Sequence, residues 1–287
     1  MKGNFTESFM KGIFLICAVT SIIAILLMCI FIFAGGIPFI QEYGFKNFLL
    51  GTEWKPSNIP QSFGILPMIL GSIYVTLGAV IIGVPIGLLT AIYLAKFSSK
   101  RLYRFLKPGI NLMAGIPSIV YGFFALVVIV PIIRDVFGGT GMNVITASLL
   151  LGIMILPTVI SMSEAAIRAV PNSYYEGSIA LGATHEKSIF SVVVPAAKSG
   201  IISSIILAIG RAIGETMAVI LVAGNQARMP VGITKGVRTL TTNIVIEMAY
   251  AADAHREALI ATAAVLFVFI LIINGAFLVV KRRTNLE

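Results

Sequence analysis

Six apolar runs divide this chain, and each is long enough to cross a lipid bilayer. A transmembrane helix needs about 20 mainly apolar residues. Inside a bilayer the backbone must satisfy its own hydrogen bonds, so runs of this length predict helices. The six runs are Ile13–Ala34, Pro67–Leu94, Ile110–Ile133, Val144–Met162, Ile201–Val222 and Leu259–Val280. The sequence therefore predicts an all-α membrane protein with six transmembrane helices, and Pro117 should bend the third of them.

The remaining sequence is too short and too apolar to form a soluble domain. Hydrophobic residues make up 58% of the chain and charged residues only 11%, against about 25% charged residues in soluble domains. The net charge of +9 comes from basic residues at the ends of the runs. Because they form no basic patch interleaved with aromatic residues, nucleic-acid binding is excluded. We expect one transmembrane domain over residues 13–280 between short cytoplasmic ends, 1–12 and 281–287.

The basic residues also set the orientation. With the N-terminus in the cytoplasm, 13 of the 21 Lys and Arg residues lie in inner segments and 7 in outer ones. The positive-inside rule therefore predicts that both termini are cytoplasmic. This places Gly35–Leu66, which holds the only tryptophan, Trp54, and Asn225–Ala258 outside. Within the second loop, the mostly apolar stretch Ile244–Ala252 is expected to lie on or dip into the membrane.

The inner loop Ser163–Gly200 is predicted to form two short helices. Ser173 and Glu176 have the spacing of a capping box for the first helix. Gly182 suits its exit, and Thr184 is placed to cap the second helix, which Pro195 should end. The simple alternative is a connector between two spans. A connector needs fewer residues, so we favour an interaction surface.

Arg211 and Glu215 are the charged residues inside the predicted spans. Four residues apart on a continuous helix, they would share one face. A charge at mid-bilayer costs about 2.5–3.5 kcal/mol on insertion scales, so such residues normally pair or face a wet path. One interpretation is a structural ion pair. The other is an anion path on which Arg211 binds an oxyanion through its forked donors and Glu215 limits how tightly the anion is held.

The sequence offers no catalytic or cofactor site. No nucleophile and base are arranged for catalysis, no His, Cys and carboxylate cluster has metal-ligand spacing, and no phosphate-binding Gly-rich loop ending in Gly-Lys-Ser/Thr occurs. His185 is expected to be a solvated surface residue. The chain is therefore not predicted to be an enzyme or to bind a cofactor, and any ATP would be hydrolysed by a partner.

The inner loop resembles the EAA loop of ABC-importer membrane subunits. The resemblance lies in the spacing of Glu176-Gly177-Ser178, Gly182, Val192 and Val194-Pro195. In that family the short helix around the glycine docks on the ATP-hydrolysing subunit and is called a coupling helix. The run His185-Glu186-Lys187 departs from the basic residue, Trp and Glu that the family often shows. The resemblance implies ATPase coupling through Glu176, Gly177, Ser178, Gly182, Ala183, Thr184 and Pro195.

The stretch from Gly210 to Val219, GRAIGETMAV, is similar to the signature of phosphate ABC transporter permeases of the PstC type. Three further stretches agree with this family: Phe48–Trp54, Gly115–Phe124 and Arg238–Thr241. The resemblance implies a type I ABC importer permease with the MetI-like fold in a bacterial or archaeal plasma membrane. It also implies a phosphate pathway at Arg211, Glu215 and Thr216. The implied partners are a PstA-type permease, two ATP-binding subunits, an extracytoplasmic phosphate-binding protein and membrane lipid.

Two rival functions remain. The same type of importer could move another oxyanion, such as molybdate or sulfate, because charge alone does not choose among them. A membrane scaffold or sensor could use the inner loop to hold an ATPase for signalling. Such a scaffold would not need Arg211 and Glu215 inside the membrane, so their removal discriminates between the two classes. A membrane enzyme is a weaker third possibility.

Overall fold

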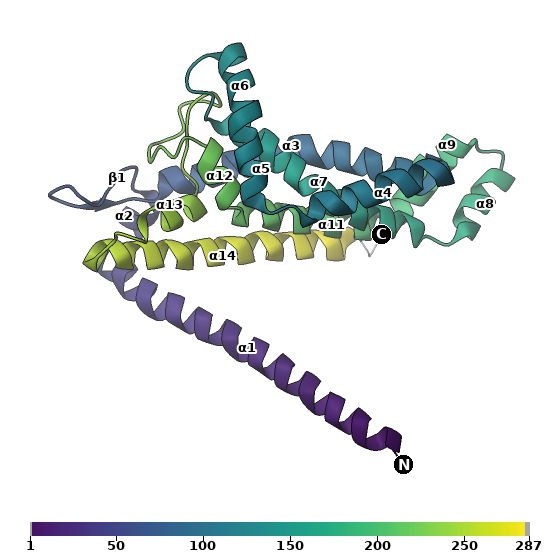
Figure 1. Cartoon of the computed structure of the whole chain (residues 1–287), viewed down its shortest axis with the longest axis horizontal. Helices are drawn as coiled ribbons and strands as arrows, with labels where there is room; N and C mark the ends of the chain where they lie inside the picture. The colour runs from purple at the N-terminus through teal and green to yellow at the C-terminus, as the bar shows by residue number, and fades with distance from the viewer. Residues whose placement is uncertain (1, 285–287) are drawn as a thin grey trace.

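A computed structural model describes residues 2–284 and is almost entirely helical (Figure 1). The α-helices are α1 (Lys2–Tyr43), α2 (Phe45–Leu50), α3 (Leu66–Ile92), α4 (Lys100–Gly115), α5 (Ser118–Phe124), α6 (Val130–Phe137), α7 (Val144–Arg168), α8 (Asn172–Ala180), α9 (His185–Ser188), α10 (Val194–Ala196), α11 (Lys198–Gly214), α12 (Met217–Val222), α13 (Leu240–Glu247) and α14 (Asp253–Thr284). Short π-helical segments are η1 (Tyr93–Phe97), η2 (Ala125–Ile129) and η3 (Ile189–Val193), and a hairpin joins β1 (Trp54–Lys55) to β2 (Ser62–Phe63).

Five of these helical stretches are long and apolar enough to cross a membrane, and a bent pair brings the total to six in residues 2–284. The bent pair joins His185–Ala196 to Lys198–Gly214 at an angle of 68°. The predicted all-α class is therefore confirmed, and the predicted six spans are reached when the bent pair is taken as one span. Of the predicted terminal segments, residue 1 and residues 285–287 lie outside the described residues.

α1 extends away from the rest of the chain (Figure 1). Its apolar window is not buried by any other part of the chain, so lipid or another subunit must cover it. Only the outer part of α1 packs on α14: a side chain at Gly36 would come within 2.9 Å of the Ala261 Cα atom. The helix runs to Tyr43, past the predicted end of the span at Ala34.

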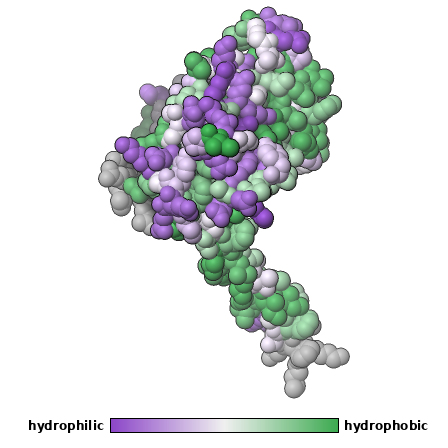
Figure 2. Space-filling model, turned by 90° about the vertical axis from the view of Figure 1, so that its left-hand side faces the viewer, coloured by the Kyte–Doolittle hydropathy of each residue, from purple (hydrophilic) through white to green (hydrophobic). Residues whose placement is uncertain are grey.

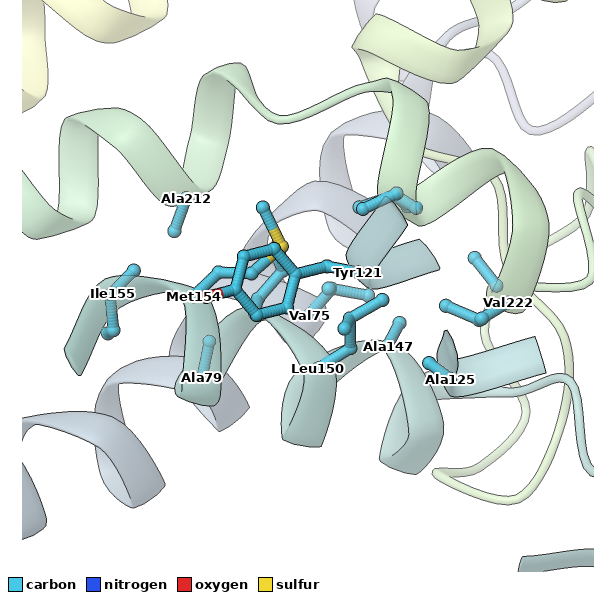
Figure 3. Close-up of a cluster of buried hydrophobic side chains, with 14 of the residues drawn as sticks. Val75, Ala79, Tyr121, Ala125, Ala147, Leu150, Met154, Ile155, Ala212 and Val222 are labelled. Carbon is cyan, nitrogen blue, oxygen red and sulfur yellow. The ribbon is translucent and has the colours of Figure 1, made fainter. Parts of the chain in front are cut away.

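α3 and α7 form the centre of the bundle. The two helices approach closely because Gly83 and Gly87 on α3 have no Cβ atom. A Cβ at Gly83 would lie 2.7 Å from the Gly152 carbonyl oxygen, and one at Gly87 would lie 2.8 Å from Val159. Between these helices and the shorter ones lies a buried apolar cluster in which the Tyr121 ring is surrounded by aliphatic side chains (Figure 3). This cluster holds the middle parts of these helices together.

The third predicted span, Ile110–Ile133, is not one helix. α4 ends at Gly115, Ile116 is extended with ψ 128°, and α5 begins after Pro117. The cause is local, because proline disfavours helical geometry in the residue before it and has no N–H to donate. The Met113 carbonyl oxygen at the break accepts from the Tyr121 hydroxyl at 2.8 Å and from the Ile116 N–H at 3.4 Å. The apolar span that meets the length test is Ser118–Phe137.

At the inner end, the loop after α7 forms α8 and α9, as predicted. α8 starts at Asn172 after Pro171, and no side chain caps it, so the predicted Ser173 cap is wrong. Gly182 has the expected positive φ of 88°, and the Thr184 hydroxyl accepts from the Lys187 N–H at 3.3 Å. Buried aliphatic residues tie this loop to the bundle; they are Ile92, Ile167, Val170, Ile189, Val193, Ala197 and Ile201.

At the outer end, both predicted outer loops fold onto each other. Trp54 is buried, and its Nε1–H donates to the Glu247 carboxylate at 2.8 Å. Helix α13, which covers the first four residues of the stretch Ile244–Ala252, is packed against α14 and α3, with Leu240 fully buried. Hydrophilic residues gather on this end face, while the flanks and α1 are hydrophobic (Figure 2).

Candidate functional site

Arg211 lies in a cleft on the open side of α11. The cleft has a volume of about 600 Å³ and is lined by Thr158, Met162, Ser203, Ile206, Leu207, Gly210, Arg211 and Asn274. One face of α11, including Ala208 and Ala212, is buried in the bundle. The opposite face is exposed at Leu207 and Arg211. The cleft is therefore open to the outside of this chain rather than enclosed by it.

The Arg211 guanidinium has few partners within the chain. Its Nη1 makes one long contact, 3.5 Å, with the Thr158 hydroxyl on α7. In the part of the chain that the structure describes, no carboxylate forms an ion pair with it. An exposed guanidinium with most of its five N–H donors unused is available to bind an oxyanion.

Glu215 lies at a break in the fifth span, not on the same helix face as Arg211. α11 ends at Gly214, and Glu215 is extended with ψ 131° before α12 begins. The predicted continuous helix Ile201–Val222, and the shared face that followed from it, are therefore wrong. The Glu215 carboxylate instead accepts from the backbone N–H groups of Thr216 at 3.2 Å and Ala218 at 3.3 Å. It thereby satisfies donors at the start of α12.

The outer loop closes over this break. The Thr241 hydroxyl, at the start of α13, donates to the Glu215 carbonyl oxygen at 3.0 Å. The Thr216 hydroxyl donates to the Gly214 carbonyl oxygen at 3.2 Å. The segment Arg238–Thr241 is seated on α3, where the Ser72 hydroxyl accepts from the Leu240 N–H at 3.0 Å. Side chains thus satisfy the backbone groups that the break frees, as a membrane interior requires.

Six of the seven predicted coupling residues lie on α8 or in the turn that follows it. The Ala183 N–H donates to the Ser178 carbonyl oxygen at 3.2 Å and the Gly182 N–H to Ile179 at 2.9 Å. With Gly182 at positive φ, this is a Schellman motif that ends α8. Glu176 and Gly177 lie on α8, which has no buried residue. Pro195 lies in α10, one residue before the helix ends at Ala196, close to the predicted end.

His185 holds the two inner helices together. Its Nδ1 lies 2.9 Å from the Tyr175 hydroxyl on α8, and its ring meets the Phe97 ring edge-on at 5.0 Å. The expectation of a solvated surface residue is wrong, because the side chain is half-buried between α8 and η1. It fixes the angle at which α8 is presented.

Four residues of the site were missed by the sequence reasoning: Thr158, Ser203, Asn274 and Thr241. The signal available for the first three was a polar side chain inside an otherwise apolar run. Within the described residues, no group of three His, Cys, Asp or Glu side chains could hold a metal ion. The arrangement suits non-covalent anion contact rather than bond-breaking chemistry.

Comparison with known proteins identifies the family. Residues 83–286 match the model of the binding-protein-dependent transport system inner membrane component. The chain belongs to this family. Membership makes it a multi-pass membrane subunit of a transporter rather than an enzyme. It also implies a second permease subunit, ATPases and a substrate-binding protein as partners.

Several members of the family are similar over most of their length. A probable ABC transporter permease, YqgH of Bacillus subtilis, is 37% identical over 82% of this chain and 77% of its own. The phosphate transport system permease PstC of Mesorhizobium japonicum is 32% identical over 86% of this chain and 81% of its own. A probable PstC of Methanocaldococcus jannaschii is 32% identical over 85% and 84%.

Solved ABC importers share the fold. A chain of an inward-facing MetNI methionine transporter has a TM-score of 0.63 at 21% identity, over 77% of this chain and 95% of its own. A chain of a bacterial alginate transporter has a TM-score of 0.67 at 17% identity, over 94% of both chains. The MetI-like importer fold expected from the sequence is therefore confirmed.

Proposed function

We propose that this chain is the PstC-type permease of an ATP-driven phosphate importer and supplies half of the translocation path. The observation that carries the proposal is the exposed Arg211 guanidinium in its cleft on α11. A guanidinium stays charged and offers forked donors that match a phosphate. The similarity to permeases named for phosphate transport favours phosphate over other oxyanions.

The cleft is open where a second permease would complete it. In the proposed complex a PstA-type subunit faces α11, and the anion passes between the two chains. Arg211 provides the positive charge, while Glu215 and Thr216 shape the break beside it. Arg211 makes one long side-chain contact within the chain, so its guanidinium is not fixed in one position. It can therefore bind an anion weakly, and weak binding permits release.

The inner loop is the proposed contact with the ATP-binding subunits. α8 buries none of its residues in this chain, and Leu181 next to it is 91% exposed. An exposed leucine at the tip of a rigid turn suits an apolar groove in a partner. A Cβ at Gly177 would meet nothing within 4 Å beyond the backbone of its own helix, so the small size of this residue is not required by the fold of this chain. We assign that requirement to the ATPase.

The outer end face is the proposed docking surface for a phosphate-binding protein. The loops Gly35–Leu66 and Asn225–Ala258 are tied together there by Trp54 and Glu247. ATP binding would close the two ATPases, move α8 and open the path toward this face. Phosphate would then pass from the binding protein into the cleft.

The test is uptake of radiolabelled phosphate by cells that lack their own high-affinity system and express this chain with its partner subunits. We expect uptake that arsenate competes and sulfate does not. Arg211→Gln should reduce uptake about 10- to 100-fold, because a hydrogen bond to a charged group contributes about 1.5–3 kcal/mol. Thr158→Val should cause a smaller loss.

The matched control is Lys198→Gln, which removes one positive charge from the inner end of the same helix, outside the cleft. It should leave uptake unchanged. If the assembled complex moves no phosphate but moves molybdate or sulfate, the substrate assignment is wrong. If Arg211→Gln transports as well as the unaltered chain, the anion path through this cleft is wrong.

A further inference from the structure

A second basic site lies away from Arg211, at the cytoplasmic ends of α4, α7 and η1, the segment that continues α3. These ends enclose a cleft of about 520 Å³. Five basic side chains line it: Lys96, Lys100, Arg104, Lys107 and Arg168. The start of α4 is at the same end of the molecule as α8 and α9 (Figure 1). Neither the transport path nor the ATPase contact proposed above uses these residues.

The inner wall of this cleft is fixed by a buried carboxylate. Glu164 on α7 is 2% exposed and contacts Lys107 Nζ at 2.7 Å and Arg168 Nε at 2.8 Å. Arg168 also donates to the Leu94 carbonyl oxygen at 2.8 Å and lies 4.5 Å above the centre of the Tyr103 ring. A hydrogen bond with Glu164 raises the pKa of the Tyr103 phenol. The two inner cations are therefore held rigidly.

The solvent-facing wall of the cleft carries cations that no carboxylate in the described part of the chain pairs with. Within the described residues, Lys96, Lys100 and Arg104 take part in no ion pair. One carboxylate, Glu164, thus faces five cations, which leaves a net charge of +4. The 16-residue helix α4 begins at Lys100 and is capped by the Ser99 hydroxyl. The positive end of its dipole adds to the charge of the cleft.

We propose that this cleft binds a phosphate group at the cytoplasmic surface of the membrane. Arginine offers forked donors and lysine a compact charge, and both suit phosphate oxygens. The group belongs either to the headgroup of an anionic phospholipid or to free phosphate in the cytoplasm. Basic pockets between transmembrane helices on this side suit lipid headgroups. The exposed apolar side chains of Leu89, Tyr93 and Phe105 lie on the same elements as the cleft and suit acyl chains.

The site does not depend on which anion the chain transports, so its test avoids the transport path. The full-length chain, purified with its partner subunits and without a binding protein, carries Arg211→Gln throughout. Three probes are added in turn: short-chain phosphatidylglycerol, short-chain phosphatidylcholine and inorganic phosphate. The dissociation constant is obtained from the rise in the thermal unfolding midpoint with probe concentration.

The deciding variant is Lys100→Gln with Arg104→Gln. Both side chains are exposed, so the protein should fold, and its midpoint without probe checks this. Each surface cation contributes about fivefold to the binding of an anionic headgroup, so the double variant should bind about 25-fold more weakly. Arg101→Gln is the matched control, because Arg101 is on the same turn but does not line the cleft. It should leave the dissociation constant unchanged.

The probes distinguish the two sources. Binding of phosphatidylglycerol that depends on Lys100 and Arg104 assigns the site to a lipid headgroup. Binding of inorganic phosphate with the same dependence assigns it to free phosphate. The proposal is overturned if neither anion binds more tightly than phosphatidylcholine, or if the double variant and the Arg101 control bind equally.

Discussion

Replacing Glu247 with alanine should unfold the outer end of the molecule at much lower denaturant concentration. The Glu247 side chain is 7% exposed and accepts from Trp54 at 2.8 Å, lies 2.7 Å from His255 and pairs with Arg238. Without it, Arg238, whose side chain is 15% exposed, would stay buried without its carboxylate. Removing one partner of a buried ion pair costs about 3–5 kcal/mol. We expect the free energy of unfolding to fall by that amount.

The assay follows from the position of the only tryptophan. Trp54 is 5% exposed and contacts Glu247 directly, so its emission reports on this cluster. The full-length chain in detergent micelles is titrated with denaturant, and the midpoint and slope give the free energy. Glu53→Ala is the matched control, since Glu53 neighbours Trp54 but forms an exposed pair with Lys55 at 2.9 Å. Exposed pairs contribute about 0–1 kcal/mol.

An equal loss of unfolding free energy in the two variants would refute the reasoning, because the burial of Glu247 would then add nothing to its contribution to stability. A second refuting result would be a native emission spectrum that Glu247→Ala leaves unchanged. The Trp54 indole would then not be hydrogen-bonded to this carboxylate.

Two further predictions concern glycines. Gly177→Trp should not lower the unfolding midpoint of this chain, since a Cβ there would meet nothing within 4 Å beyond the backbone of its own helix. It should nevertheless abolish co-purification of the ATPase; retained ATPase would contradict the assigned contact. Gly71→Ala should destabilise the chain, because a Cβ there would overlap the Arg238 carbonyl oxygen. Gly109→Ala, in open space on α4, should instead stabilise it by up to about 1 kcal/mol, and thermal unfolding of both variants checks the sign.

The sequence predicted the features that depend on local chemistry. The apolar runs located α3, α7 and α14, because lipid requires a continuous apolar helix. Gly182 and Thr184 end and begin helices where predicted, since a positive φ and a hydroxyl cap are needed at those positions. These features require no knowledge of distant residues.

Other features depend on tertiary contacts and could not be predicted from spacing. Apolar residues continue across the break at Glu215, so the pattern gave no sign that the helix stops at Gly214. The break persists because Thr241, far along the chain, satisfies the freed carbonyl oxygen. Once the helix is broken, the four-residue spacing no longer brings Arg211 and Glu215 together. For the same reason the neighbours of Arg211, such as Asn274, come from distant spans.

The two broken spans are adjacent, and this links the inner loop to the cleft. α5 packs on α12 so closely that a Cβ at Gly122 would lie 2.9 Å from the Ala218 Cα atom. The outer pieces of both spans therefore form one packed unit. α11 is separate from α12 at Glu215. At its other end it meets the preceding helical segment, His185–Ala196, at an angle of 68°, next to the loop that carries α8. Its 17 residues make a rod of about 25 Å. We propose that a displacement of α8 is carried along α11 to Arg211, and that the break at Glu215 absorbs it without moving the outer end.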